Sequence, residues 1–85
     1  MIVVDVIVGK KYRHFKGEYY RVICIACDSQ TPVGEPLKEV VVYESLYGKH
    51  KIWTRPYELF IERVDKDMYP DVDQEYRFEL VDEYE

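Results

Sequence analysis

The sequence is poor in the residues from which helical bundles are built. Its 85 residues include a single alanine, 4 leucines and 2 methionines, against 12 valines and 6 isoleucines. β-branched side chains lose rotamer freedom in a helix and pack well on the pleated surface of a sheet. The composition therefore excludes a helical bundle and predicts an all-β protein. A chain of this length builds one hydrophobic core, so we expect a single domain over residues 1–85.

The sequence also lacks a long hydrophobic run. The apolar segment Met1–Val8 is interrupted by Asp5 and has neither a basic flank nor a small-residue cleavage site. A membrane-spanning helix needs about 20 consecutive apolar residues, and a secretory signal needs those flanking features. We therefore expect a soluble, cytoplasmic protein with no membrane partner.

Cysteine and histidine are scarce, with 2 of each in the chain. Cys24 and Cys27 form a Cys-x-x-Cys pair, but no second pair follows, and His14 and His50 do not have zinc-finger spacing. The run around the cysteines has the character of a strand, on which positions three apart point to opposite faces. We therefore expect no metal, no cofactor and no disulfide, with Cys24 a small core residue and Cys27 a free thiol on the other face.

Catalytic patterns are missing as well. The histidines and carboxylates form no recognisable acid–base or nucleophile constellation. Glu58 and Glu62 are four residues apart, which would bring them together on a helix, but the helical turn expected there is too short. The sequence thus indicates a protein that is not an enzyme.

What the sequence does contain is a series of short strand patterns separated by turn residues. A single helical turn is expected at Pro56–Phe60, because proline suits the start of a helix. Gly9–Gly17 should be a loop or a bent strand entry, and Asp28–Lys38 a turn-rich loop. The expected strands are Ile2–Val8, Tyr19–Cys27, Glu39–Ser45, Lys51–Arg55, Ile61–Val64 and a last one containing Tyr76, Phe78 and Leu80.

Strands of this kind with one helical turn before a late strand predict a small SH3-like, partly open antiparallel barrel. The alternative is an OB-fold, which normally has a longer helix between its third and fourth strands. The apolar segment Ile2–Val8 would leave an exposed edge, and pairing between copies protects such edges. We therefore expect a homo-oligomer, most simply a dimer, with this strand or the acidic C-terminal end at the interface. The competing arrangement is that the strand closes its own barrel.

Charge is distributed unevenly along the chain. The formal net charge is −5, yet residues 9–64 carry ten basic against seven acidic side chains, and residues 65–85 carry nine acidic against two basic ones. The domain therefore divides into an extra N-terminal strand (1–8), a basic central part (9–64) and an acidic C-terminal segment with a last strand (65–85). The acidic segment either solubilises the protein or screens its basic part.

Aromatic residues are interleaved with the basic ones near the turns of the central part. Flat rings stack on bases, and arginine and lysine bind phosphates, so this mixture suits an anionic ligand with a ring, of which a nucleotide is the simplest. Trp53 and Arg55 share a strand face, and Gly17 and Gly48 allow the neighbouring turns to approach. The candidate ligand-binding residues are Trp53, Arg55, His14, Lys16, Tyr43 and Tyr47.

Other functions remain open at this point. About half of the aromatic residues are accounted for by the needs of a small core. An SH3-like barrel could instead act as an adaptor that takes an extended or proline-rich peptide, and the rings and cations could also bind single-stranded nucleic acid. Duplex DNA is the weaker candidate, because the chain is net acidic and duplex binding needs several phosphate contacts.

Several spaced motifs make the chain resemble a known family. These are Tyr-Arg-His-Phe-Lys-Gly at 12–17, Leu-Tyr-Gly at 46–48, Trp-Thr-Arg-Pro at 53–56 and Tyr-Arg-Phe at 76–78. From about Gly9 to Leu80 the sequence resembles the small bacterial and phage family called domain of unknown function 1653. The resemblance implies a small β domain and no established activity. In a phage, a small oligomeric binder of this kind could sequester a host signalling nucleotide.

Overall fold

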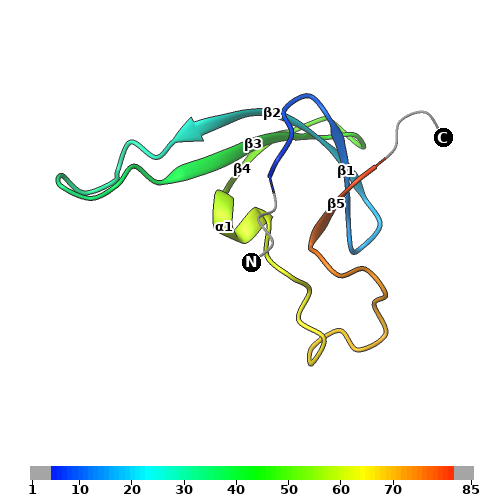
Figure 1. The fold of residues 1–85 in the computed structure, drawn as a ribbon. Coiled ribbons are helices and arrows are strands. Elements are labelled where there is room, and N and C mark those ends of the chain that lie inside the picture. The colour runs from blue at the N-terminus through cyan, green and yellow to red at the C-terminus, as the bar shows by residue number, and fades with distance from the viewer. Residues whose placement is uncertain (1–4, 82–85) are drawn as a thin grey trace.

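Five antiparallel strands form one open sheet in the order β4-β3-β2-β1-β5 (Figure 1). The computed structural model describes residues 5–81. Its elements are β1 (Lys11–His14), β2 (Tyr19–Cys27), β3 (Glu39–Ser45), β4 (Ile52–Pro56), α1 (Tyr57–Phe60) and β5 (Phe78–Leu80). The all-β class and the open antiparallel sheet with one helical turn are confirmed, and this arrangement is consistent with an SH3-like barrel. No helix among the described residues is long and apolar enough to cross a membrane.

The strand predictions with the strongest alternation are the most accurate. Tyr19–Cys27 and Glu39–Ser45 form strands with the predicted bounds, and the fourth strand is displaced by one residue, to Ile52–Pro56. The helical turn follows Pro56 as expected. The segment Gly9–Gly17 contains β1, and the last strand begins at Phe78.

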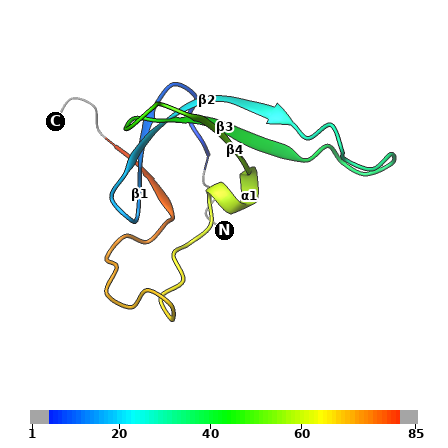
Figure 2. The same cartoon turned by 180° about the vertical axis from the view of Figure 1, so that it is seen from behind.

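The core lies between the sheet and α1, on what we call the inner face of the sheet. Figures 1 and 2 show α1 and the segment 61–77 on this one side of the curved sheet. Phe60 of α1 is 1% exposed and stacks on Phe78 of β5, with ring centroids 4.1 Å apart. The other members of the buried cluster are Tyr12, Val22, Val41 and Tyr43. Pro56 thus ends β4 where a single helical turn can deliver Phe60 beneath the sheet.

The N-terminal segment departs from the prediction. Residues 5–8 do not form a strand; residues 2–4 lie outside the described part of the chain. The backbone N–H of Val6 donates to the Tyr57 hydroxyl (3.0 Å), and that of Ile7 donates to the Tyr12 hydroxyl (2.9 Å). Tyrosine hydroxyls therefore satisfy this backbone in place of a neighbouring strand, and the strand predicted at Ile2–Val8 is wrong for residues 5–8.

The strand predicted at Ile61–Val64 is also wrong. This segment makes one isolated bridge, between Arg63 and Tyr76. The buried side chain of Gln74 takes the place of a longer ladder, because its amide nitrogen lies 3.0 Å from the carbonyl oxygen of Arg13 and 2.8 Å from that of Tyr76. A side-chain amide, which no strand pattern reveals, thus anchors this part of the chain.

A β-bulge in β2 changes which side chains face the core. Val22 pairs with Tyr43 and Cys24 pairs with Val42, so the register shifts by one residue at Ile23. An extra residue reverses the alternation of the strand beyond it. Ile25 consequently packs against the core and Cys24 is exposed. The prediction of Cys24 as a core residue is wrong. Cys27 is an exposed free thiol as expected, but its pairing with Glu39 puts it on the same face as Ile25 and Val41, so the face predicted for it is wrong.

The hairpin between β2 and β3 projects from the body of the protein as an arm, whose tip is the loop 28–38 (Figures 1 and 2). Val33 is fully exposed there and Leu37 is 68% exposed. The radius of gyration is 13.9 Å, whereas a compact chain of this length would have about 12 Å. The turn-rich loop therefore makes the protein more extended and contributes little to its core.

The stacked pair in the core predicts a large effect of one truncation. Phe60→Ala should lower the free energy of unfolding by about 3–5 kcal/mol, because it removes a fully buried ring and leaves a cavity. Leu59→Ala, in the same helical turn but 42% exposed, should cost about 1 kcal/mol or less. Urea denaturation measures both, and equal losses for the two variants would contradict this packing.

The bulge predicts the reactivity of the two thiols. Cys24 and Cys27 should both react with a maleimide in the absence of denaturant, because both side chains are exposed. Mass spectrometry of the labelled protein distinguishes one adduct from two. Protection of Cys24 until urea is added would show that β2 is regular and that Cys24 faces the core.

Candidate ligand-binding site

Aromatic rings from four strands form a continuous layer at one end of the inner face. Tyr20 of β2 is central to it, with ring centroids 5.4 Å from Tyr43, 5.6 Å from Phe78 and 6.4 Å from His14. These contacts are edge-to-face, the geometry that aromatic quadrupoles favour. Tyr47 joins the layer from the turn after β3, because its hydroxyl lies 3.0 Å from that of Tyr20. Burial and this hydrogen bond raise the pKa of Tyr20.

Arg55 brings a cation to this layer from the edge strand β4. Its guanidinium carbon lies 5.8 Å from the ring centroid of Phe78, on the opposite edge strand β5. Its Nε donates a long hydrogen bond of 3.4 Å to the Tyr43 hydroxyl. The side chain is half-buried, and among residues 5–81 no carboxylate lies within ion-pair distance of it. The guanidinium of one edge strand therefore lies over a ring of the opposite edge strand, and no carboxylate of residues 5–81 forms an ion pair with it.

His14 lies where several cations converge. Its Nδ1 accepts a hydrogen bond of 3.1 Å from the backbone N–H of Lys16, and its ring is 4.9 Å from Phe78. Burial, with the neighbouring charges of Arg77, Arg55 and Lys16, lowers the pKa of His14 to about 4. The imidazole is consequently neutral at neutral pH and carries its proton on Nε2, where it is a hydrogen-bond donor.

Lys16 and Arg77 differ in whether a carboxylate compensates their charge. Lys16 is exposed, and its Nζ lies 5.9 Å from the ring centroids of both Phe15 and Tyr69. Arg77 forms an ion pair of 2.6 Å with Glu62 and lies over Phe15. The charge of Arg77 is therefore already compensated, whereas Lys16 and Arg55 retain charge that a ligand could use.

The six predicted residues do not all have the same role. His14 and Tyr47 are members of the aromatic layer, and Arg55 contacts it through Phe78 and Tyr43. The Lys16 ammonium lies over Phe15 and Tyr69 instead. Tyr43 is 5% exposed, so its ring belongs to the core and only its hydroxyl reaches Arg55. Trp53 is the register partner of Tyr43 and shares its face, but it lies at the open edge and is 44% exposed. Of the six predicted residues, Tyr47, which is 42% exposed, and Trp53 therefore have the rings with the most surface left for stacking.

Sequence reasoning missed Tyr20, Phe78 and Arg77 as members of this cluster. Phe78 reaches it because β5 pairs with β1, in the register His14 to Phe78. That pairing joins strands from the two ends of the described chain, so no pattern of neighbouring residues in the sequence indicates it. The available hint was the Tyr-Arg-Phe motif at 76–78, which contains two of the three missed residues.

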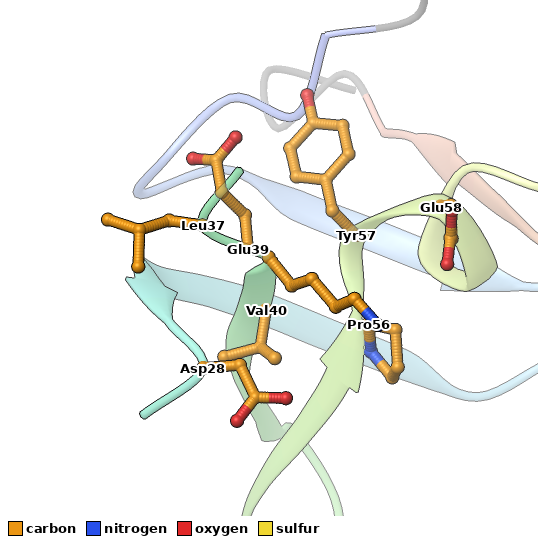
Figure 3. A pocket seen from close by; sticks show the side chains of 8 residues that line it. Asp28, Leu37, Glu39, Val40, Pro56, Tyr57 and Glu58 are labelled. Atoms are coloured by element: carbon orange, nitrogen blue, oxygen red, sulfur yellow. The ribbon is translucent and has the colours of Figure 1, made fainter. Parts of the chain in front are cut away.

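Two cavities are lined by acidic side chains, and the second of them reaches the aromatic layer at Phe78. One, of about 480 Å³, lies at the base of the arm beside α1 and is lined by Asp28, Leu37, Lys38, Glu39, Val40, Pro56, Tyr57 and Glu58 (Figure 3). The other, of about 360 Å³, is lined by Asp5, Ile7, Tyr12, Glu75, Tyr76, Phe78, Glu79 and Leu80. Each has three carboxylates, which disfavour an anion. Within residues 5–81 no group of three or more His, Cys, Asp or Glu side chains is placed to hold a metal ion.

The comparison with known families gives a match over most of the chain. A family model described as "Protein of unknown function (DUF1653)" matches residues 10–80, a range that contains all six predicted site residues. No curated protein and no solved structure is significantly similar to the chain. The match supplies no activity, so the function has to be argued from the side chains themselves.

The environment of His14 predicts an acid-sensitive fold. The unfolded chain binds a proton at His14 near the ordinary pKa of 6.5, and the folded chain does so near 4. Between these values only the unfolded state is protonated, so stability should fall as the pH falls from about 6.5 to about 4. In His14→Gln this part of the pH dependence should disappear. Urea denaturation at a series of pH values measures it, and identical slopes for both proteins would contradict the assignment.

Proposed function

We propose that this chain, which belongs to the DUF1653 family of proteins of unknown function, is a non-catalytic binding protein for an anionic ligand that carries a flat ring. A nucleotide is the simplest such molecule. The observation that carries the proposal is Arg55, a half-buried guanidinium set against aromatic rings without a carboxylate partner among the described residues.

An uncompensated cation in this position favours an anion. Partial burial removes water from the guanidinium, and within residues 5–81 its polar contact is a long hydrogen bond to a neutral hydroxyl. A phosphate would accept two parallel hydrogen bonds from the guanidinium, which is the geometry that arginine matches best. The charges of Arg55 and Lys16 both act on His14, so the exposed Lys16 ammonium and the Nε2 proton of the neutral His14 add further donors near the guanidinium.

The exposed rings suit the other half of the ligand. Tyr47 is fixed by its hydroxyl contact with Tyr20, and Trp53 lies at the edge next to Tyr43. A base stacking on such rings gains about 1–3 kcal/mol per ring. Fixed rings lose little conformational entropy on binding, which favours affinity.

The same site argues against turnover. The Nδ1 lone pair of His14 is occupied by the Lys16 N–H, and the lowered pKa makes the ring a weak base at neutral pH. Arg77 is held by Glu62, so this carboxylate is engaged in an ion pair. A protein with these properties would return its ligand unchanged, which fits storage or sequestration of a nucleotide.

The central test is the substitution of Arg55. Wild-type protein should bind members of a panel of mono-, di- and cyclic nucleotides in calorimetry, and Arg55→Ala should bind the same ligand about 1.5–3 kcal/mol more weakly. The affinity of Arg55→Lys should fall between those of the wild type and Arg55→Ala, because lysine keeps the positive charge but cannot donate two parallel hydrogen bonds. Arg63→Ala is the matched control, since Arg63 is exposed, lies over Tyr76 and pairs with Glu75 away from the site.

Two results would contradict the proposal. One is that no nucleotide binds the wild type, and the other is that a folded Arg55→Ala variant binds as tightly as the wild type. Binding of a proline-rich peptide in place of nucleotides would favour the adaptor function. Binding of single-stranded oligonucleotides but of no mono-, di- or cyclic nucleotide would favour a function in binding single-stranded nucleic acid.

A further inference from the structure

On the edge strand β4, backbone N–H and C=O groups at alternate residues point away from β3. Ser45 N–H donates to the Lys51 carbonyl over 2.9 Å, so residues 45 and 51 are a hydrogen-bonded pair of the β3–β4 ladder. Paired residues in an antiparallel ladder alternate between bonded and non-bonded positions. Trp53 and Arg55 therefore bond to β3, whereas Ile52 and Thr54 turn their N–H and C=O groups outward. No hydrogen bond within residues 5–81 reaches these four groups.

The outward pattern is short and nearly symmetric. Ile52 and Thr54 flank Trp53, and the next outward position is Pro56, which has no N–H to offer. The side chains along the edge are uncovered, with Ile52 61% and Trp53 44% exposed. An exposed edge of this kind is a template for another strand. The strand that matches this edge best is an antiparallel one that also has two outward-facing residues separated by a single residue.

We propose that β4 pairs antiparallel with β4 of a second copy of this chain, about a two-fold axis at Trp53. Ile52 of one copy then opposes Thr54 of the other, and the backbone hydrogen bonds use the N–H and C=O groups of Ile52 and Thr54 in both strands. The two Trp53 side chains oppose each other directly on the inner faces, at a non-hydrogen-bonded position where side chains approach most closely. A foreign strand would form the same backbone bonds without the tryptophan contact.

This interface differs from the one that the N-terminal sequence suggested. Residues 5–8 are bound through the hydroxyls of Tyr12 and Tyr57 and offer no strand of their own. The β4 pairing also places Lys51 opposite Arg55 of the second copy, on the face that carries the candidate site. Like charges in opposing positions weaken a strand pair, so a multivalent anion should strengthen this dimer. The pairing itself needs no ligand and is tested without one.

The chain contains a single tryptophan, which gives the pairing its own spectroscopic signal. An exciton-coupled circular dichroism couplet between two indoles can arise only between copies. Sedimentation equilibrium should give twice the 10.3 kDa chain mass at high concentration, and the couplet should disappear on dilution together with the dimer.

Thr54→Pro is the decisive variant. It removes an outward N–H and leaves the hydrogen bonds to β3 intact, and edge strands tolerate proline at such positions. Association should weaken at least tenfold and the couplet should vanish, whereas Thr54→Ala, which keeps the N–H, should remain dimeric. Ile52→Pro repeats the test at the second outward N–H if Thr54→Pro does not fold.

Several outcomes would overturn the pairing. They are a wild type that stays monomeric at high concentration, a dimer without the couplet, and folded proline variants that associate as tightly as the wild type. A dimer without the couplet would show that another surface, such as the N-terminal segment, forms the interface. A monomer that takes up an extended peptide along β4 would show a foreign partner.

Discussion

The ring of Phe78 is the point on which both the fold and the candidate site depend. It stacks on Phe60 at 4.1 Å and so joins β5 to α1 beneath the open sheet. On its other sides it contacts His14 at 4.9 Å and supports the guanidinium of Arg55 at 5.8 Å. An open barrel has no strand pairing between its edges, so contacts of this kind must hold those edges together. In the proposed function, this buried layer supports the Arg55 guanidinium and the exposed ring of Tyr47 that would meet the ligand.

The distribution of ion pairs separates structural cations from those available to a ligand. Arg77 is paired with Glu62, and Arg63 with Glu75, so their charges are compensated within the protein. Arg55 has aromatic and hydroxyl neighbours instead. The neutral state of His14 follows from its burial and from the cations around it. No carboxylate of the described residues pairs with Arg55, and the carboxylates that line the two cavities are other side chains, although one of these cavities also reaches Phe78.

How much of this could be predicted from the sequence depended on whether the signal was local. Alternation defined β2 and β3, and Pro56 marked the end of β4 and the start of α1. The bulge at Ile23 left no signal, because an extra residue in a strand needs no glycine or proline. The pairing of β5 with β1, which brings Phe78 to His14, is a long-range contact. Sequence patterns therefore indicated the cations Arg55 and Lys16 and the exposed rings of Trp53 and Tyr47, whereas Tyr20, Phe78 and Arg77, which lie among them, were missed.

We propose that an anion with a ring binds at one end of the inner face and in neither acidic cavity. The most direct test is an NMR titration of the wild-type protein with a nucleotide, observing the Arg55 Nε–H, the Trp53 indole N–H and the His14 ring. The account predicts that these signals shift together and saturate, with Tyr47 among the affected rings. Shifts confined to the cavity of Asp28, Glu39 and Glu58, or none at saturating nucleotide, would contradict it.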